Sequence, residues 1–295
     1  MPGLSLFGGY RARMQTNTPP RSTRSTIRLT RRGRVVLIAT GAVVAGTAVA
    51  VPLLSPADEG DSRPRTLAVP AGWRASQVYA AVDKALALPA GTTGKSLAKA
   101  RLKLPDEAGG NPEGYLFPAT YPLDEKTTPE RLLSAMADTA DKKFNGAPIA
   151  AGAQRNAMNV YQAVIIASIV QAEAATEADM GKVARVIFNR LERGMPLQMD
   201  STVNYALGRA PRGTPRSDTR VESPYNTYQR MGLPPTPIAN PGEEALRAAI
   251  NPTPGDWLYF VTVRPGDTRF TADHAEHRRN LAESGHGRRS SPAPR

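Results

Sequence analysis

Residues 160–174 read VYQAVIIASIVQAEA, and this stretch decides the fold of the chain. Apolar side chains fall on every side of a helix until the last few positions, which predicts a helix buried in the core of a domain. The expected helix runs from about Asn156 to Glu173. Three large apolar residues share a helix face with Glu173, namely Ile166, Ile169 and Val170. A carboxylic acid therefore ends a helix built for burial, where an unpaired charge is costly.

Glu173 has two readings on this pattern. A carboxyl group held against apolar side chains has a raised pKa and can donate a proton near neutral pH. Alternatively, the helix frays at its end and Glu173 is solvated, as most glutamates are. The pattern leaves both readings open.

The positive charge of the chain is concentrated at its start. The formal net charge is +12 over 295 residues, and residues 1–34 hold eight arginines and no acid, which leaves +4 for the rest. A tail of arginine, serine and threonine without aromatic clusters cannot build a core, so residues 1–34 are predicted to be disordered. A nucleic-acid-binding arm is one use of such a tail, but the segment that follows argues against it.

Residues 35–54, VVLIATGAVVAGTAVAVPLL, carry no charge and are long enough to cross a bilayer as one helix. Arginines precede the segment and the acidic stretch PADEGD follows it, so the positive-inside rule predicts a cytoplasmic N-terminus and an extracytoplasmic remainder. A cleaved signal peptide, with AVA at 48–50 as its cleavage site, is the alternative. The apolar run exceeds the usual h-region of about 7–15 residues, which favours a retained single-pass anchor in a bacterial cell membrane. Either way the bulk of the chain is exported, and without cysteine it has no disulfide or thiol chemistry.

Beyond a polar linker at 55–66, the sequence predicts an α+β fold in two parts. Residues 67–122 begin with a strand, a Pro-Ala-Gly turn and a short helix that carries Val78, Ala81 and Val82 on one face, which indicates a small αβ subdomain. Residues 123–281 hold the buried helix, two further helices in MGKVARVIFNRLERG and EEALRAAINP, and a hairpin in DWLYFVTVRPGDTRF, which indicates a mixed α/β domain. The low-complexity tail 282–295 is predicted to be disordered.

Polar loops separate the later elements. The segments PLQMDSTVNYALG and SPYNTYQRMGLPPTPIANPG supply the side chains that a carbohydrate groove needs, although ordinary proline-rich loops are the simpler reading for any one residue. The chain lacks GxSxG, HExxH, Walker and dinucleotide-binding motifs. His274 and His277 have helical spacing, but no acid or cysteine completes a metal-ligand pattern, so we expect no metal.

Taken together, these motifs resemble the endolytic murein transglycosylase family (MltG-like, YceG-like). The resemblance covers about residues 67–281. It is carried, in the family's order, by EGYLFPATYPL, ASIVQAEA, VARVIFNRLERGMPLQMDSTVNYALG, SPYNTYQRMGLPPTPIANPG, LYFVTV and FTADHAEH. It implies a LysM-like subdomain at 67–122 and a YceG-like catalytic domain at 123–281, behind one membrane helix.

The resemblance also implies that Glu173 is the catalytic acid. The family's helix commonly ends in a Glu-x-Glu pair whose second member is catalytic, and here Gln171 takes the first place. The departure spares the catalytic position but removes a carboxylate that could raise the pKa of Glu173 by repulsion, so desolvation must raise it instead. The other matching positions are implied to line or support the groove: Gln198, Asp200, Tyr225, Asn226, Thr227 and His277.

The implied reaction cuts the β-1,4 bond between N-acetylmuramic acid and N-acetylglucosamine in nascent glycan strands and leaves 1,6-anhydro ends, without a cofactor. One carboxyl group can serve as acid and then as base, whereas a hydrolase needs two. Peptidoglycan, the membrane and cell-wall synthases are the expected partners, and nucleic acid is not. Two alternatives stay open: a water-using muramidase with Glu177 or Asp200 as second carboxylate, and a non-enzymatic glycan-binding scaffold.

Overall fold

The structure, a computed structural model, describes residues 65–209 and 218–284. The predicted tail 1–34, the membrane segment 35–54 and most of the linker lie outside these residues, as does nearly all of the tail 282–295. Within the described ranges, no helix has the length and apolar character needed to cross a membrane.

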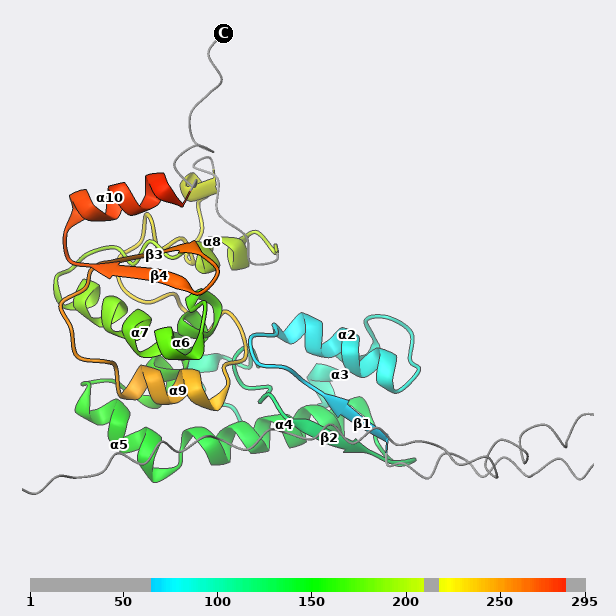
Figure 1. The fold of residues 1–295 in the computed structure, drawn as a ribbon. Helices are drawn as coiled ribbons and strands as arrows, with labels where there is room; N and C mark the ends of the chain where they lie inside the picture. Colours follow the sequence, from blue (N-terminus) through cyan, green and yellow to red (C-terminus); the bar gives the residue numbers. More distant parts are fainter. Residues whose placement is uncertain (1–64, 210–217, 285–295) are drawn as a thin grey trace, which may run out of the picture. The chain divides into compact units, whose positions relative to one another are not determined.

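The first part of the described chain, which we call the N-terminal module (residues 65–123), is a two-stranded antiparallel sheet with helices between its strands (Figure 1). Its elements are β1 (Arg65–Ala68), α2 (Ala75–Ala85), α3 (Thr92–Ser96), the 3-10 turns η1 (Leu97–Lys99) and η2 (Asp106–Ala108), and β2 (Thr120–Leu123). The strand register pairs Arg65 with Leu123 and Ala68 with Thr120. Val78 and Val82 on α2 are fully buried, as the helical spacing predicted. The predicted strand and helix are both present, and a separate LysM-like subdomain stays a prediction.

Helix α4 (Pro129–Phe144) contributes to two hydrophobic cores. It begins after Thr128, whose hydroxyl accepts a hydrogen bond from the backbone N–H of Arg131, and Pro129 is its first residue. Its first turns pack Leu132, Leu133 and Met136 into the core of the N-terminal module, and its last turns place Ala140 and Phe144 in the second core. The helix therefore joins the two parts into one packed unit.

The second core is built around α6 (Val160–Glu173), whose residues 163–170 are all buried. Its neighbours are α5 (Ala147–Arg155), α7 (Glu177–Glu192) and α9 (Glu243–Ile250). The hairpin of β3 (Tyr259–Arg264) and β4 (Asp267–Thr271) lies between α7 and the last helix, α10 (His274–Glu283) (Figure 1). The burial predicted for this helix and the C-terminal hairpin are both confirmed.

Two local predictions are wrong. Helix α6 begins at Val160 rather than near Asn156, because Ala157 has a φ of +54° and interrupts the helical path. The Asn159 side chain then caps the new helix by accepting from the Gln162 N–H at 2.8 Å. The second error lies in a segment read as a polar loop, which contains a short helix, α8 (Asp200–Ala206). A 3-10 turn, η3 (Asp218–Arg220), follows in the next loop.

Candidate active site

Glu173 is the last residue of α6, and its carboxylate reaches the start of α8. Oε1 of Glu173 accepts a hydrogen bond from the backbone N–H of Ser201 at 2.9 Å. Burial raises the pKa of the Glu173 carboxyl above its ordinary value, the Ser201 backbone N–H and hydroxyl oppose the rise, and the negative charge of Asp200 adds to it. Glu173 is half-buried and ends an ordered helix, so a frayed and fully solvated helix end does not describe the folded chain.

Desolvation is the main cause of the raised pKa, as the sequence predicted. Ile166, Ile169 and Val170 are fully buried in the core on which Glu173 sits. Gln171, at the first position of the Glu-x-Glu pattern, is used differently: its Oε1 accepts the backbone N–H of Gly242 at 3.0 Å. This bond ties the end of α6 to the start of α9, so Gln171 supports the helix that carries Glu173.

Asp200 and Tyr228 form a second polar contact beside Glu173. The Tyr228 hydroxyl donates to Oδ1 of Asp200 at 2.6 Å. The pKa of Tyr228 is raised by burial, by Asp200 and more weakly by Glu173, so its phenol keeps its proton at neutral pH. Tyr228 was not among the predicted site residues, although it lies in the quoted motif SPYNTYQRMG, two positions after Asn226.

Thr227 fixes the turn that leads into α8. Its carbonyl accepts the N–H of Gln198 at 2.9 Å, and its hydroxyl accepts the N–H of Met199 at 3.0 Å and meets the Thr202 hydroxyl at 2.9 Å. Gln198 has a φ of +56°, a conformation that L-residues adopt at a cost and that surrounding contacts must hold. Thr227 is 1% exposed, so it supports the site rather than lining it.

Arg190 holds the other side of the same turn. This arginine of α7 is 6% exposed and donates to the carbonyls of Leu258, Pro196 and Leu197 and to Oε1 of Gln198. Its guanidinium carbon lies 5.1 Å from the centre of the Tyr259 ring. Because the Arg190 guanidinium donates to three backbone carbonyls, we infer that this residue positions the loop. In the sequence, Arg190 is only one polar position of a predicted helix, so the sequence alone could not reveal its contacts with the loop.

The remaining predicted residues lie apart from the Glu173 carboxylate. Asn226 is fully buried, and its amide donates to the carbonyls of Thr219 and Val221 at 3.0 and 2.7 Å, so it braces the loop. The Tyr225 hydroxyl meets that of Thr236 at 2.8 Å.

His277 stands on α10, where it stacks on Tyr259 with 5.0 Å between ring centres. Burial, Arg190 and His274 lower the pKa of His277 to about 4, so its imidazole is neutral at pH 7.

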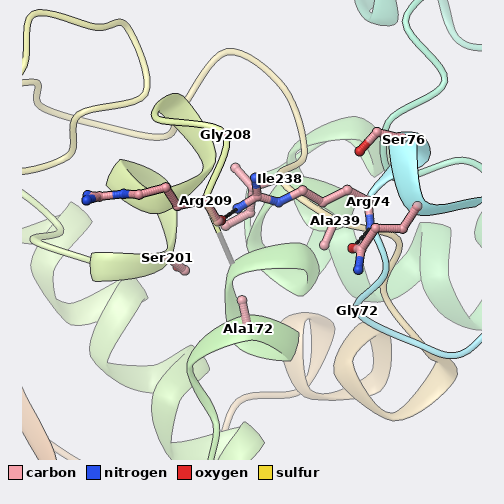
Figure 2. Close-up of a pocket in the computed structure, with 10 residues that line it drawn as sticks. Gly72, Arg74, Ser76, Ala172, Ser201, Gly208, Arg209, Ile238 and Ala239 are labelled. Atoms are coloured by element: carbon pink, nitrogen blue, oxygen red, sulfur yellow. Dashed lines mark hydrogen bonds between the residues drawn. The ribbon is translucent and has the colours of Figure 1, made fainter. Parts of the chain in front are cut away.

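A pocket of about 240 Å³ opens between the N-terminal module and the Glu173 turn (Figure 2). The residue before Glu173 and the residue whose amide holds it both line this pocket, although Glu173 itself does not. The lining residues are Gly72, Arg74, Ser76, Gln77, Ala172, Ser201, Gly208, Arg209, Ile238 and Ala239.

Two buried polar residues dock the N-terminal module against this pocket. Asn240, fully buried, accepts the Leu116 N–H through its side chain and donates to the carbonyl of Trp73. Glu113, 5% exposed, accepts the Ala75 N–H at 2.9 Å and the Tyr205 hydroxyl at 3.2 Å. Glu113 thus joins the first residue of α2 to the far end of α8.

The fold and the motifs define a known class. A model of the YceG-like family matches residues 47–283, and the chain belongs to this family. The resemblance drawn from the sequence is thereby confirmed, as is a mixed α+β fold of the YceG-like type.

Two relatives and one solved structure are similar to this chain. An endolytic murein transglycosylase of Bacillus subtilis (strain 168) is 40% identical over 166 residues, which are 56% of this chain and 46% of that protein. A protein of the same name from Streptococcus pneumoniae serotype 2 is 38% identical over 177 residues, 58% of this chain and 32% of that protein. The chain thus matches less than half the length of either relative. A crystal structure of a YceG-like protein from Listeria monocytogenes is 29% identical, with a TM-score of 0.64 over 73% of this chain and 75% of that one.

Proposed function

We propose that this protein is an endolytic lytic transglycosylase that cleaves the β-1,4 bond between N-acetylmuramic acid and N-acetylglucosamine inside murein glycan strands. The observation that carries the proposal is Glu173, a carboxyl group at the end of a buried helix, held by one backbone amide and with a pKa raised by burial. Such a group can give up and recover a proton near neutral pH. The names of the relatives support the same activity.

In the first step, protonated Glu173 donates its proton to the glycosidic oxygen while the bond from that oxygen to C1 of the muramoyl ring breaks. The ring passes through an oxocarbenium-like state. In the second step, the Glu173 carboxylate takes the proton of the C6 hydroxyl while O6 bonds to C1. The products are a 1,6-anhydromuramoyl end and a glucosamine end with a free 4-hydroxyl, and Glu173 is again protonated. No metal or organic cofactor enters the cycle.

The neighbouring acids favour this single-carboxylate route over hydrolysis. A retaining or inverting hydrolase needs a second carboxylate on the opposite side of the bond. Asp200 already accepts the Tyr228 hydroxyl, and Glu177 is exposed at the first position of α7. Of the proposed groove residues, Gln198 is exposed and can contact a sugar, whereas the Asn226 amide is spent on backbone carbonyls.

The location of the reaction is part of the proposal. A retained anchor at residues 35–54, with a cytoplasmic N-terminus, would hold the catalytic part outside the membrane, next to newly made strands and cell-wall synthases. There it would end glycan elongation. Cells lacking the protein should then have longer glycan strands, measured by chromatography of strands freed of peptide. Unchanged strand lengths would contradict this role.

The test of the reaction compares the full-length chain in detergent with its Glu173→Gln variant on purified glycan strands. Mass spectrometry reads the new ends. We expect 1,6-anhydro ends from the parent and a loss of activity of at least about a hundredfold in the variant, because general acid–base catalysis contributes about 10²–10⁴. Arg155→Gln, an exposed change on α5, serves as the control and should cut normally.

Each other result points to a different protein. Reducing ends in place of anhydro ends would identify a water-using muramidase and direct the search to Asp200 or Glu177. Binding of strands without any cutting, unchanged by Glu173→Gln, would identify a glycan-binding scaffold.

A further inference from the structure

The pocket beside Glu173 is built from two separate parts of the chain. The N-terminal module supplies the wall that includes Arg74. The chain after residue 123 supplies Ala172 and Ser201 on the opposite side (Figure 2). Its volume of about 240 Å³ is below the 300–1,000 Å³ that is typical for pockets enclosing a whole ligand. It therefore suits a substituent of a larger molecule.

Arg74 brings a positive charge with donors to spare into this pocket. A guanidinium has five N–H donors and stays charged at all relevant pH values. Arg74 spends one of them on the backbone carbonyl of Arg209 at 2.6 Å, and its carbon lies 5.0 Å from the centre of the Tyr205 ring. Figure 2 shows the side chain reaching across the pocket toward Arg209, whose own side chain points away.

No acid in the described part of the chain forms an ion pair with Arg74. Glu113 is near enough to attract it, but both carboxylate oxygens of Glu113 are already bonded, one to the Ala75 N–H and one to the Tyr205 hydroxyl. The side chain of Arg209 is paired with Asp218. Arg74 is therefore a cation that the pocket presents to an incoming group.

Two neighbouring features of the pocket leave Arg74 as its anion-binding group. The Ser201 side chain lines the pocket, and its hydroxyl lies beside the Glu173 carboxylate, whose pKa it helps to lower. The N-terminal turn of α2, an 11-residue helix without an acid in its first turn, contributes Ser76 and Gln77 to the opposite wall. The first N–H of that helix, from Ala75, already donates to the Glu113 carboxylate, so the anion-binding group that the pocket offers is Arg74.

We infer that this pocket is a subsite for a carboxylate of the glycan substrate, bound by Arg74. This inference rests on the proposed function, since the sugar rings of murein are neutral and its negative groups are carboxylates of the lactyl ether or of the attached peptide. Because Ala172 and Ser201 line the same pocket, a carboxylate bound there lies next to the turn that holds Glu173. The subsite thus selects which rings along the strand are presented to the acid.

The experiment measures binding rather than cutting. The full-length chain carries Glu173→Gln so that strands stay intact, and binding is measured with fluorescently labelled strands. Four strand preparations are compared: peptide-bearing strands, peptide-free strands with the lactyl carboxylate exposed, and each of these with its carboxylates converted to neutral methylamides. Each is tested with Arg74 present, with Arg74→Gln, with Arg74→Lys, and with Arg155→Gln, which removes the same charge from the exposed end of α5.

With Arg74 present, neutralising the carboxylate should weaken binding about tenfold, because a charged partner roughly doubles the strength of a hydrogen bond. Arg74→Gln should bind charged and neutral strands alike, Arg74→Lys should keep part of the preference, and Arg155→Gln should keep all of it. A preference shown only by peptide-free strands assigns the lactyl group, and one shown only by peptide-bearing strands assigns the peptide.

The inference is overturned if Arg74→Gln weakens binding of charged and neutral strands equally, since Arg74 then acts only through its bond to Arg209. Arg74→Lys keeps the charge and guards against a loss of fold in the glutamine variant. A charge preference that depends on Arg74, together with a parent chain (Glu173 intact) that cuts no strands in the activity test, would support the subsite and refute the proposed reaction. Anhydro products from the parent chain, combined with equal binding of charged and neutral strands, would support the proposed reaction and refute the subsite.

Discussion

Gly114 allows the sharpest test of how the two parts pack, because its backbone and its surroundings both forbid a side chain. Its φ is +87°, a region that costs an L-residue about 1–2 kcal/mol. A Cβ built there would lie 2.5 and 2.6 Å from Cβ and Cγ of Pro237, far inside contact distance. Overpacking of this kind costs about 1–3 kcal/mol. Gly114→Ala should therefore lower the free energy of unfolding by about 2–5 kcal/mol.

Gly110→Ala is the matched control, since Gly110 has a φ of +82° and no atom lies within 4 Å of the place that a Cβ would occupy. The free energy of unfolding of Gly110→Ala should fall only by the cost of the backbone conformation, about 1–2 kcal/mol. Urea unfolding of both full-length variants, followed by circular dichroism, gives the difference. Equal losses would refute the steric argument. Pro237 precedes Ile238 in the pocket wall, so Gly114→Ala should also cut glycan strands more slowly under conditions where it remains folded.

Two further predictions concern the charge of Glu173. Because burial raises the folded-state pKa of this carboxyl above its unfolded value, its contribution to stability is full at low pH and is lost as pH rises through the folded pKa. The melting-temperature gain of Glu173→Gln over the parent should therefore grow from pH 4 to pH 8, and a gain that is constant with pH would contradict a raised pKa. Asp200→Asn removes a negative charge that raises the pKa of Glu173, so the alkaline limb of kcat/KM should move to lower pH. A limb that stays in place would mean that another group limits the reaction.

Local pattern was enough to predict the framework of this fold. The unbroken apolar run of α6, the Val78–Val82 face of α2 and the Pro-Gly turn of the C-terminal hairpin each depend on near neighbours in the sequence. The start of α6 was missed because it depends on the positive φ of Ala157, and an alanine side chain gives no sign of a positive φ. Helix α8 was missed because seven residues of mixed polarity carry little periodic signal.

The sequence singled out Glu173 as a candidate, but not the residues that support it. Glu173 could be singled out because an acid at the end of an apolar helix is locally anomalous. Arg190 and Arg74 act through contacts 68 and 135 positions away, with Leu258 and Arg209, and only the folded chain brings these residues together. Among the predicted groove residues, Asn226 and Thr227 looked like ligands for a sugar, yet their polar atoms bond to the protein itself.

Helix α8 has a consequence for how such chains can be recombined. Its first turn holds Glu173 through the Ser201 amide, and its last turn meets Glu113, which in turn caps α2 of the N-terminal module. A chimera with a foreign first module would lose Glu113, which lies within residues 65–123, and would leave the Tyr205 hydroxyl of α8 without its partner. The disturbance would reach the turn that holds Glu173 through the seven residues of α8. We therefore expect related proteins to inherit the two modules together. A chimera that replaces residues 65–123 should fold well only if α8 and its loop are replaced from the same relative.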